Sequence, residues 1–176
     1  MARNIGAQAA RGGRIFFFDA DVTLKPDFLE KSIGELNTRN LEVSAAYVWP
    51  MSKKAIDWLY YSICNSIFFL TQTFYPYVAG SSLISTPGVH KRIHGFDKTI
   101  LLGEDSDYVK RASRITRFRM LRKSVSVSVR RFEKEGRLKL GAQYLLAFFY
   151  RIFLGEIRSP FFRYSFGSYS FRAKKK

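Results

Sequence analysis

The stretch Arg14-Ile-Phe-Phe-Phe-Asp-Ala-Asp21 decides the fold that we expect for this chain. Its apolar part is short and continuous, with two glycines just in front of it and carboxylates behind it. Such a run is typical of a buried strand of the parallel-sheet kind. Asp19 and Asp21 then follow the carboxyl end of that strand, which is where open α/β sheets bind ligands.

On both sides of this stretch, helical and strand-like segments alternate along the chain. We expect further strands at 41–49, 83–85, 117–121 and 125–129, and helices at 2–11, 25–38, 53–73, 87–94, 104–112 and from 131 onward. The alternation predicts an α/β layered fold, with a mostly parallel sheet flanked by helices and with further helices at the C-terminal end. Residues 1–130 are expected to form one unit, and residues 131–176 an appended basic and aromatic region with a tail.

Charge is distributed unevenly along the 176 residues. Residues 1–107 carry 11 basic and 11 acidic residues, whereas residues 108–176 carry 19 basic and 3 acidic ones, so the net charge of +16 lies in the C-terminal part. This asymmetry indicates an anionic partner, such as a membrane surface, a nucleic acid or a phosphate-rich ligand. Cys64 is the only cysteine, which excludes an intrachain disulfide and a cysteine-based zinc site and favours a reducing, cytoplasmic compartment.

Asp19 and Asp21 are spaced so that both carboxylates can face one cleft. Hard cations such as Mg²⁺ and Mn²⁺ prefer oxygen ligands, and a carboxylate together with a diphosphate commonly holds them. An isolated Asp-x-Asp, however, more often caps the loop after a strand. The motif alone therefore leaves both interpretations open, with capping the commoner one.

Several short motifs together carry more information than Asp-x-Asp does alone. In order, they are Ala2-Arg-Asn-x-Gly6, the Phe-x-Asp-Ala-Asp that ends at Asp21, Ile93-His-Gly-Phe-Asp97, Gly103-Glu-Asp-Ser-Asp107 and Val129-Arg-Arg-Phe132. Their order and spacing resemble family 2 of the inverting glycosyltransferases, and the resemblance covers about residues 2–136. It implies a GT-A fold, a nucleotide-binding α/β sandwich, and transfer of a sugar from a nucleotide-diphosphate donor to an acceptor hydroxyl.

The resemblance also implies roles for individual residues. Asp21 would be a direct ligand of Mg²⁺ or Mn²⁺, and Asp19 would contact the metal or the ribose of the donor. Asp105 would be the general base for the acceptor hydroxyl, supported by Glu104. From the residues alone, the commoner interpretation of Glu104 and Asp105 is that they cap the first turn of a helix, where negative charge is favoured.

Three further residues are candidates for donor binding. Gly80 lies in a loop that the resemblance places near the donor sugar, and a glycine lets the backbone approach a ligand closely. Arg130 and Arg131 suit the oxygens of a diphosphate. For all three, an ordinary turn glycine and a solvated arginine pair are equally good interpretations.

The beginning of the chain departs from the family pattern. Family members usually open with two or three βα units that hold the nucleotide, and this sequence begins inside the helix that follows them. We therefore expect a fragment of the catalytic domain, weak or inactive alone, and the DNA upstream of Met1 would test this. The Gln-x-x-Arg-Trp motif of processive synthases has no match in the chain, which disfavours a processive polymerase.

The C-terminal region allows more than one interpretation. Residues 138–154 are apolar but interrupted, which suits an interfacial helix on an anionic membrane or a helix that covers the sheet. An interfacial helix would be explained by an acceptor of cell-envelope biosynthesis, lipid-linked or a polysaccharide, that is located at the inner face of the membrane. The alternative function is that of a non-catalytic basic aromatic module that binds nucleic acid or a membrane surface. Nucleic-acid binding, however, leaves the carboxylate clusters unexplained.

Overall fold

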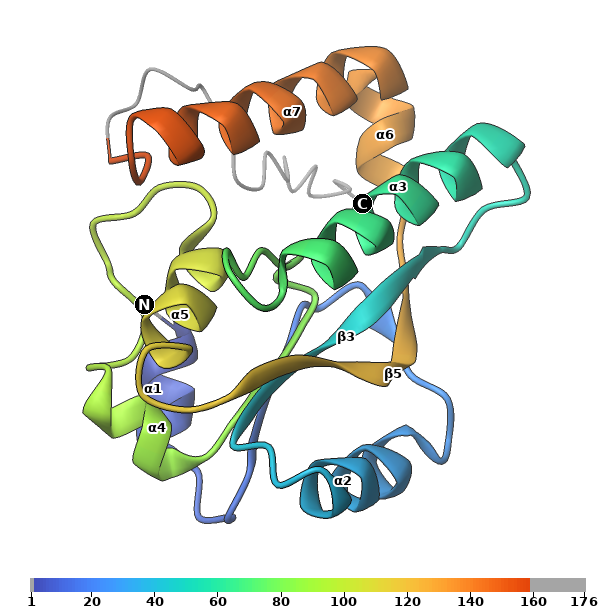
Figure 1. Ribbon diagram of the computed structural model, residues 1–176. Helices are drawn as coiled ribbons and strands as arrows, with labels where there is room; N and C mark the ends of the chain where they lie inside the picture. Colours follow the sequence, from blue (N-terminus) through green and yellow to red (C-terminus); the bar gives the residue numbers. More distant parts are fainter. Residues whose placement is uncertain (1, 159–176) are drawn as a thin grey trace, which may run out of the picture.

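The computed structural model describes residues 2–158, which form an α/β layered fold around one five-stranded sheet (Figure 1). The helices are α1 Ala2–Ala9, α2 Phe28–Thr38, α3 Ala55–Thr71, α4 Pro87–Arg92, α5 Glu104–Ala112, α6 Arg130–Glu135 and α7 Arg137–Phe153. The strands are β1 Ile15–Phe18, β2 Val22–Thr23, β3 Val43–Pro50, β4 Ser82–Ser85 and β5 Phe118–Val127, in the sheet order β1-β4-β3-β5-β2. The expected α/β fold is confirmed. The C-terminal part of the expected basic and aromatic region, residues 159–176, lies outside the described residues.

The sheet is not mostly parallel, so this part of the expectation is wrong. Of the four adjacent strand pairs, only β3 with β5 is parallel, whereas β1 with β4, β3 with β4 and β2 with β5 are antiparallel. The apolar run of β1 indicates burial, and burial does not determine the direction of the neighbouring strand. β1, β3 and β5 still point the same way, because β4 lies reversed between β1 and β3.

The two strands expected at 117–121 and 125–129 are one strand, β5. Ala45 pairs with Met120 and Tyr47 with Ser124, so the single residue Ala46 of β3 lies opposite three residues of β5, 121–123. A β-bulge therefore falls on the polar residues that separate the two expected segments. A bulge bends a strand and interrupts its ladder without ending it, which is why the sequence pattern breaks where the strand continues.

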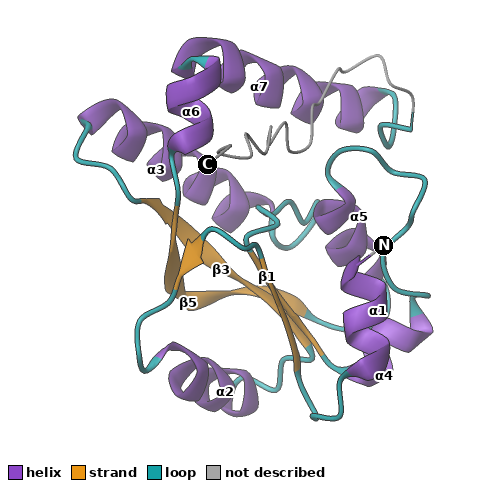
Figure 2. Ribbon diagram, turned by 180° about the vertical axis from the view of Figure 1, so that it is seen from behind, coloured by secondary structure: helices purple, strands orange, loops and turns teal. Residues whose placement is uncertain are grey.

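Apolar side chains pack on both faces of the sheet. On one face, α2 contributes Leu36 to a small buried cluster with Leu41, Ile84 and Leu121. The main core lies on the other face, where the side chains of α4 and α5 pack against β1, β3 and β4. In Figure 1, α2 lies below the sheet and α3 above it, and the view from behind in Figure 2 agrees.

The C-terminal helices pack on α3. Tyr60 and Tyr61 of α3 contact Phe132 of α6 edge to face, and Leu140 of α7 is buried in the same cluster. Within the part of the chain that the structure describes, no helix is both long and apolar enough to span a bilayer. The boundary between residues 1–130 and 131–176 stays a prediction.

Candidate active site

The strand directions bring several of the expected site residues to one edge of the sheet. Asp19 and Asp21 follow the carboxyl end of β1. Because β4 is antiparallel to β1 and Phe18 pairs with Ser82, the start of β4 lies beside the end of β1, and Gly80 lies just before it. The carboxyl end of β5 reaches the same edge, where the N–H of Ser128 donates to the backbone oxygen of Asp21 at 3.3 Å.

A single arginine joins the carboxylates. Arg3 of α1 donates from Nη2 to Asp19 at 2.7 Å, and from Nη1 to Glu104 at 3.0 Å and to Asp105 at 2.5 Å. Its Nη2 also reaches the backbone oxygen of Gly80 at 3.4 Å. The acidic cluster, defined as Asp19, Glu104 and Asp105, is therefore assembled around Arg3 from three separate segments of the chain.

Asp105 is the buried member of the acidic cluster, with only 7% of its surface exposed. Burial, together with the negative charges of Glu104 and Asp19, raises the pKa of its carboxyl to about 7 against the opposing effect of Arg3. A buried carboxyl loses hydration of its charged form, and this outweighs the nearby cation here. A group with a pKa near neutral is well suited to accept and release a proton.

Gly80 is required by the close approach of Asp105. A Cβ added at Gly80 would lie 2.0 Å from Oδ2 of Asp105 and 2.6 Å from its Cγ. Since side-chain atoms do not approach one another so closely, any larger residue would displace the carboxylate. Gly80 thus has a contact that an ordinary turn glycine would not have.

The helix that carries Asp105 is held in place by its neighbours. Ser106 exchanges hydrogen bonds with the backbone of Val78, accepting at 3.2 Å and donating at 3.1 Å. Asp107, the next residue, forms an ion pair of 2.7 Å with Arg111, which lies one turn further along the helix. These buried contacts fix the first turn of α5 against the loop that contains Gly80.

The helix that carries Arg3 is anchored in a similar way. The side-chain amide of Asn4 accepts from the backbone N–H of Phe96 and donates to its carbonyl, both at 2.9 Å. The guanidinium of Arg3 also lies over the Phe96 ring, 5.4 Å from its centroid. The Ala-Arg-Asn and Gly-Phe-Asp motifs therefore contact each other directly in the folded chain.

Three of the expected residues lie apart from the acidic cluster. The side chain of Asp21 is exposed and makes no hydrogen bond or ion pair within residues 2–158. Arg130 is exposed and donates to Ser128 at 3.2 Å, and Arg131 forms an ion pair of 2.8 Å with Glu135. In the described structure, neither arginine contacts Asp19, Glu104 or Asp105.

The donor atoms at the sheet edge suit a hard cation only in part. Among residues 2–158, no three or more His, Cys, Asp or Glu side chains are placed to hold a metal by themselves. Asp21 is exposed, and Asp19 uses one carboxylate oxygen for Arg3. Two carboxylates at a strand end fit Mg²⁺ or Mn²⁺ provided that a bound ligand supplies the remaining oxygens.

Arg3 belongs to the Ala2-Arg-Asn-x-Gly6 motif, but the sequence alone does not indicate its role. The signal that points to its role is electrostatic. If Asp19, Glu104 and Asp105 share one cleft, their mutual repulsion calls for a cation, and Arg3 lies in a motif of the same series. No pattern in the sequence indicated the buried contact between Ser106 and Val78.

The α/β sheet flanked by helices is similar to the GT-A fold. The chain belongs to glycosyl transferase family 2, whose family model matches residues 1–126. The structure is similar to the crystal structure of residues 1–349 of TarS from S. aureus, with a TM-score of 0.51 and 14% sequence identity. The match covers 72% of this chain and 39% of that chain. No curated protein sequence matches the chain.

Replacing Arg3 with Met should raise the pKa of Asp105 above its value of about 7, because the adjacent cation lowers the pKa of this carboxyl. Titration of the Asp105 carboxyl by carbon NMR measures this change. Arg11→Met, which removes an exposed arginine just beyond the same helix, is the control. An unchanged Asp105 titration in Arg3→Met would contradict the assigned electrostatics.

Proposed function

We propose that this chain supplies the acceptor-side and metal-side residues of an enzyme that transfers a sugar, with inversion, from a nucleotide-diphosphate donor to an acceptor hydroxyl. The observation that carries the proposal is the convergence of Asp19, Glu104 and Asp105 on Arg3, with Asp105 buried and its pKa near 7. Membership of glycosyl transferase family 2 supports it. Because the match covers 39% of TarS 1–349, the activity of the whole protein is part of this proposal.

In this proposal Asp105 is the general base. Its carboxylate accepts the proton of the acceptor hydroxyl as that oxygen bonds to the anomeric carbon, while the bond from the anomeric carbon to the diphosphate breaks. Attack from the side opposite the leaving group inverts the carbon. Arg3 holds the carboxylate in place, and Glu104 supports it by raising its proton affinity.

Asp21 and Asp19 would hold Mg²⁺ or Mn²⁺ together with the phosphate oxygens of the donor. When bound, the ion neutralises negative charge on the departing diphosphate. Gly80 is proposed to border the donor sugar, because its backbone lies against Asp105. Arg130 and Arg131 are proposed to bind the donor diphosphate from the first turn of α6, close in sequence to the Ser128 contact with Asp21.

The acceptor is proposed to be a glycan or a lipid-linked chain of the cell envelope, presented at the inner face of the membrane. The basic excess of residues 108–176 supports contact with an anionic surface. A carrier lipid would then bring the acceptor hydroxyl to the enzyme at that surface.

Removal of the metal is expected to lower transfer strongly. In an active enzyme that includes these residues, EDTA and Asp21→Ala should each reduce sugar transfer by about 10²-fold or more, because a bound ion contributes several kcal/mol to stabilising the transition state. Release of the nucleotide diphosphate from a panel of nucleotide sugars, with Mn²⁺ restored, is the measurement. Asp27→Ala removes an exposed carboxylate that pairs with Lys31 and should leave transfer unchanged. Full activity in EDTA would refute the metal assignment.

A further inference from the structure

Helix α3 exposes a stripe of large apolar side chains. Three of them, Leu59, Ile63 and Leu70, are 58%, 53% and 65% exposed. With Ile56 they are spaced three, four and seven residues apart, which places them on one side of a helix. A single exposed leucine is ordinary on a protein surface, but a continuous stripe along a helix marks an interaction surface.

Helix α7 exposes a second stripe with the same kind of spacing. Its members are Leu138, Leu145, Phe149 and Ile152, spaced seven, four and three residues apart. The two helices lie side by side. The ring of Tyr60 in α3 lies 3.8 Å from the position that a Cβ would occupy on Gly141 of α7. We call the two stripes together the apolar face.

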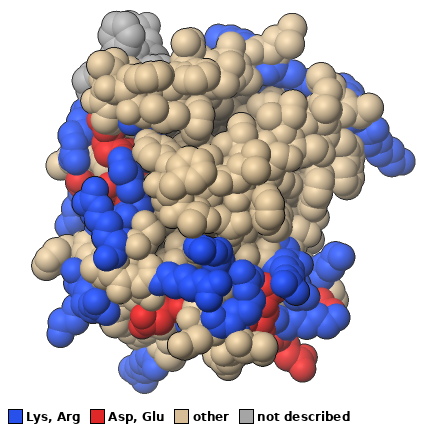
Figure 3. Space-filling view, in the orientation of Figure 1, with Lys and Arg blue, Asp and Glu red and all other residues tan. Residues whose placement is uncertain are grey.

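The apolar face has no exposed carboxylate on either helix. Asp57 is the only acidic residue of α3 and α7, and it is buried in an ion pair of 2.7 Å with Arg137. Lys139 adds an exposed cation to α7. In Figure 3, the surface over α3 and α7 is largely free of charged side chains. Below it, Lys and Arg gather along a border with a smaller number of Asp and Glu among them.

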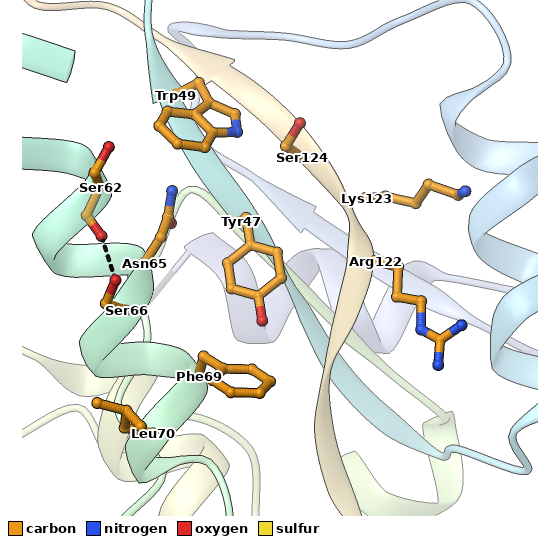
Figure 4. A pocket seen from close by; sticks show the side chains of 10 residues that line it. All are labelled: Tyr47, Trp49, Ser62, Asn65, Ser66, Phe69, Leu70, Arg122, Lys123 and Ser124. Atoms are coloured by element: carbon orange, nitrogen blue, oxygen red, sulfur yellow. Dashed lines mark hydrogen bonds between the residues drawn. The ribbon is translucent and has the colours of Figure 1, made fainter. Parts of the chain in front are cut away.

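A groove of about 580 Å³ connects the apolar face to this basic border. Phe69 and Leu70 of α3 line one side, Tyr47 and Trp49 of β3 form the middle, and the bulged part of β5 contributes Arg122 and Lys123 on the other side. Figure 4 shows the aromatic side chains beside α3 and the two cations beyond β5. Apolar and cationic groups are thus adjacent on one surface.

We propose that the apolar face docks on an anionic lipid bilayer, with the exposed side chains of α3 and α7 in the acyl boundary and the basic border among the headgroups. An apolar surface bordered by Lys and Arg is what an interfacial membrane site requires. A second copy of the chain fits less well, since each copy carries a net charge of +16 and the two would repel. The inference deepens the proposed membrane contact, because it adds α3 to the C-terminal region.

Vesicle flotation tests the inference. The protein should float with vesicles of phosphatidylcholine mixed with phosphatidylglycerol, bind vesicles of phosphatidylcholine alone more weakly, and lose affinity as salt is raised. Leu59→Gln on α3 and Leu145→Gln on α7 should each lower the partition coefficient about tenfold, because each removes a large exposed apolar group. Leu29→Gln changes an exposed leucine of α2, on the far side of the sheet, and should bind as the unaltered protein does.

Leu59→Gln shows whether α3 or the basic tail is responsible for vesicle binding, because the sequence of the tail is unchanged in that variant. Unchanged partitioning of Leu59→Gln would overturn the inference, as would a stable dimer in sedimentation that Leu59→Gln and Leu145→Gln dissociate. Sugar transfer to a water-soluble acceptor, measured without vesicles, should be the same in Leu59→Gln as in the unaltered protein. If the unaltered protein failed to bind the anionic vesicles while its Asp21-dependent transfer was intact, only the docking surface would be refuted.

Discussion

Asp105→Asn is expected to lower the rate of sugar transfer by about 10²–10⁴-fold, the contribution of a positioned general base. Asn has nearly the same shape and can still contact Arg3, but it does not accept the proton of the acceptor hydroxyl. The rate of the unaltered enzyme should rise with pH through about 7, because only the ionised carboxyl of Asp105 acts as a base. This rising limb should be absent in Asp105→Asn.

The same substitution has an expected effect on stability with a defined sign. The pKa of Asp105 is raised from 3.8 to about 7 in the folded chain, so the folded state keeps this proton over a pH range in which the unfolded state has lost it. Stability from this group is therefore lost as the pH rises between those values. Relative to the unaltered protein, the Tm of Asp105→Asn should increase from pH 4 to pH 8.

Asp107→Asn is the matched control for both measurements. Asp107 lies on the same helix and is also buried, but it pairs with Arg111 and not with Arg3. Its replacement should change transfer less than tenfold, so the two variants separate chemistry from helix packing. Equal losses in Asp105→Asn and Asp107→Asn would mean that neither carboxylate is the base.

The sequence motifs anticipated the carboxylates of the site better than they anticipated the sheet. Each motif marks a local structure, such as a strand end at Asp19 or a helix start at Glu104, and both were predictable from neighbouring residues. The direction of β4 between β1 and β3 depends on pairing between distant segments, which apolar periodicity does not encode. The bulge in β5 similarly depends on its pairing with β3.

The role of Arg3 could be predicted from the sequence only in part. Its motif was visible, but its partners are 16, 101 and 102 residues away in the sequence. Only the folded arrangement of α1, β1 and α5 brings them within hydrogen-bonding distance. The requirement for a cation among three carboxylates could be inferred from the charges, but the identity of that cation could not.

Arg151→Met is expected to destabilise the folded chain by about 3 kcal/mol, because breaking a buried ion pair leaves one charge without its partner. Arg151 of α7 is 3% exposed, and its Nη2 forms an ion pair of 2.7 Å with Glu156. Lys110 lies 3.7 Å from the other oxygen of Glu156 and offsets part of the loss. The free energy of unfolding in urea measures the effect.

The position of Arg151 predicts a second consequence at the acidic cluster. A Cβ added at Gly103 would lie 2.6 Å from Nη1 of Arg151, so the guanidinium packs directly against the residue that precedes Glu104. Gly103 has a φ of 83°, a conformation that glycine adopts readily. Removing the guanidinium leaves space beside this turn, and the first turn of α5 should become less well fixed. Arg151→Met should then also change the titration of Asp105.

Arg158→Met is the control, since it removes another arginine from the same end of the described chain. Arg158 pairs with Asp97, but its side chain is 52% exposed. A pair of this kind is worth about 1 kcal/mol or less, so this variant should unfold almost as the unaltered protein does. If Arg151→Met were no more destabilising than Arg158→Met, α7 would not be coupled to α5. A large loss of stability with an unchanged Asp105 titration would instead confine the role of Arg151 to packing.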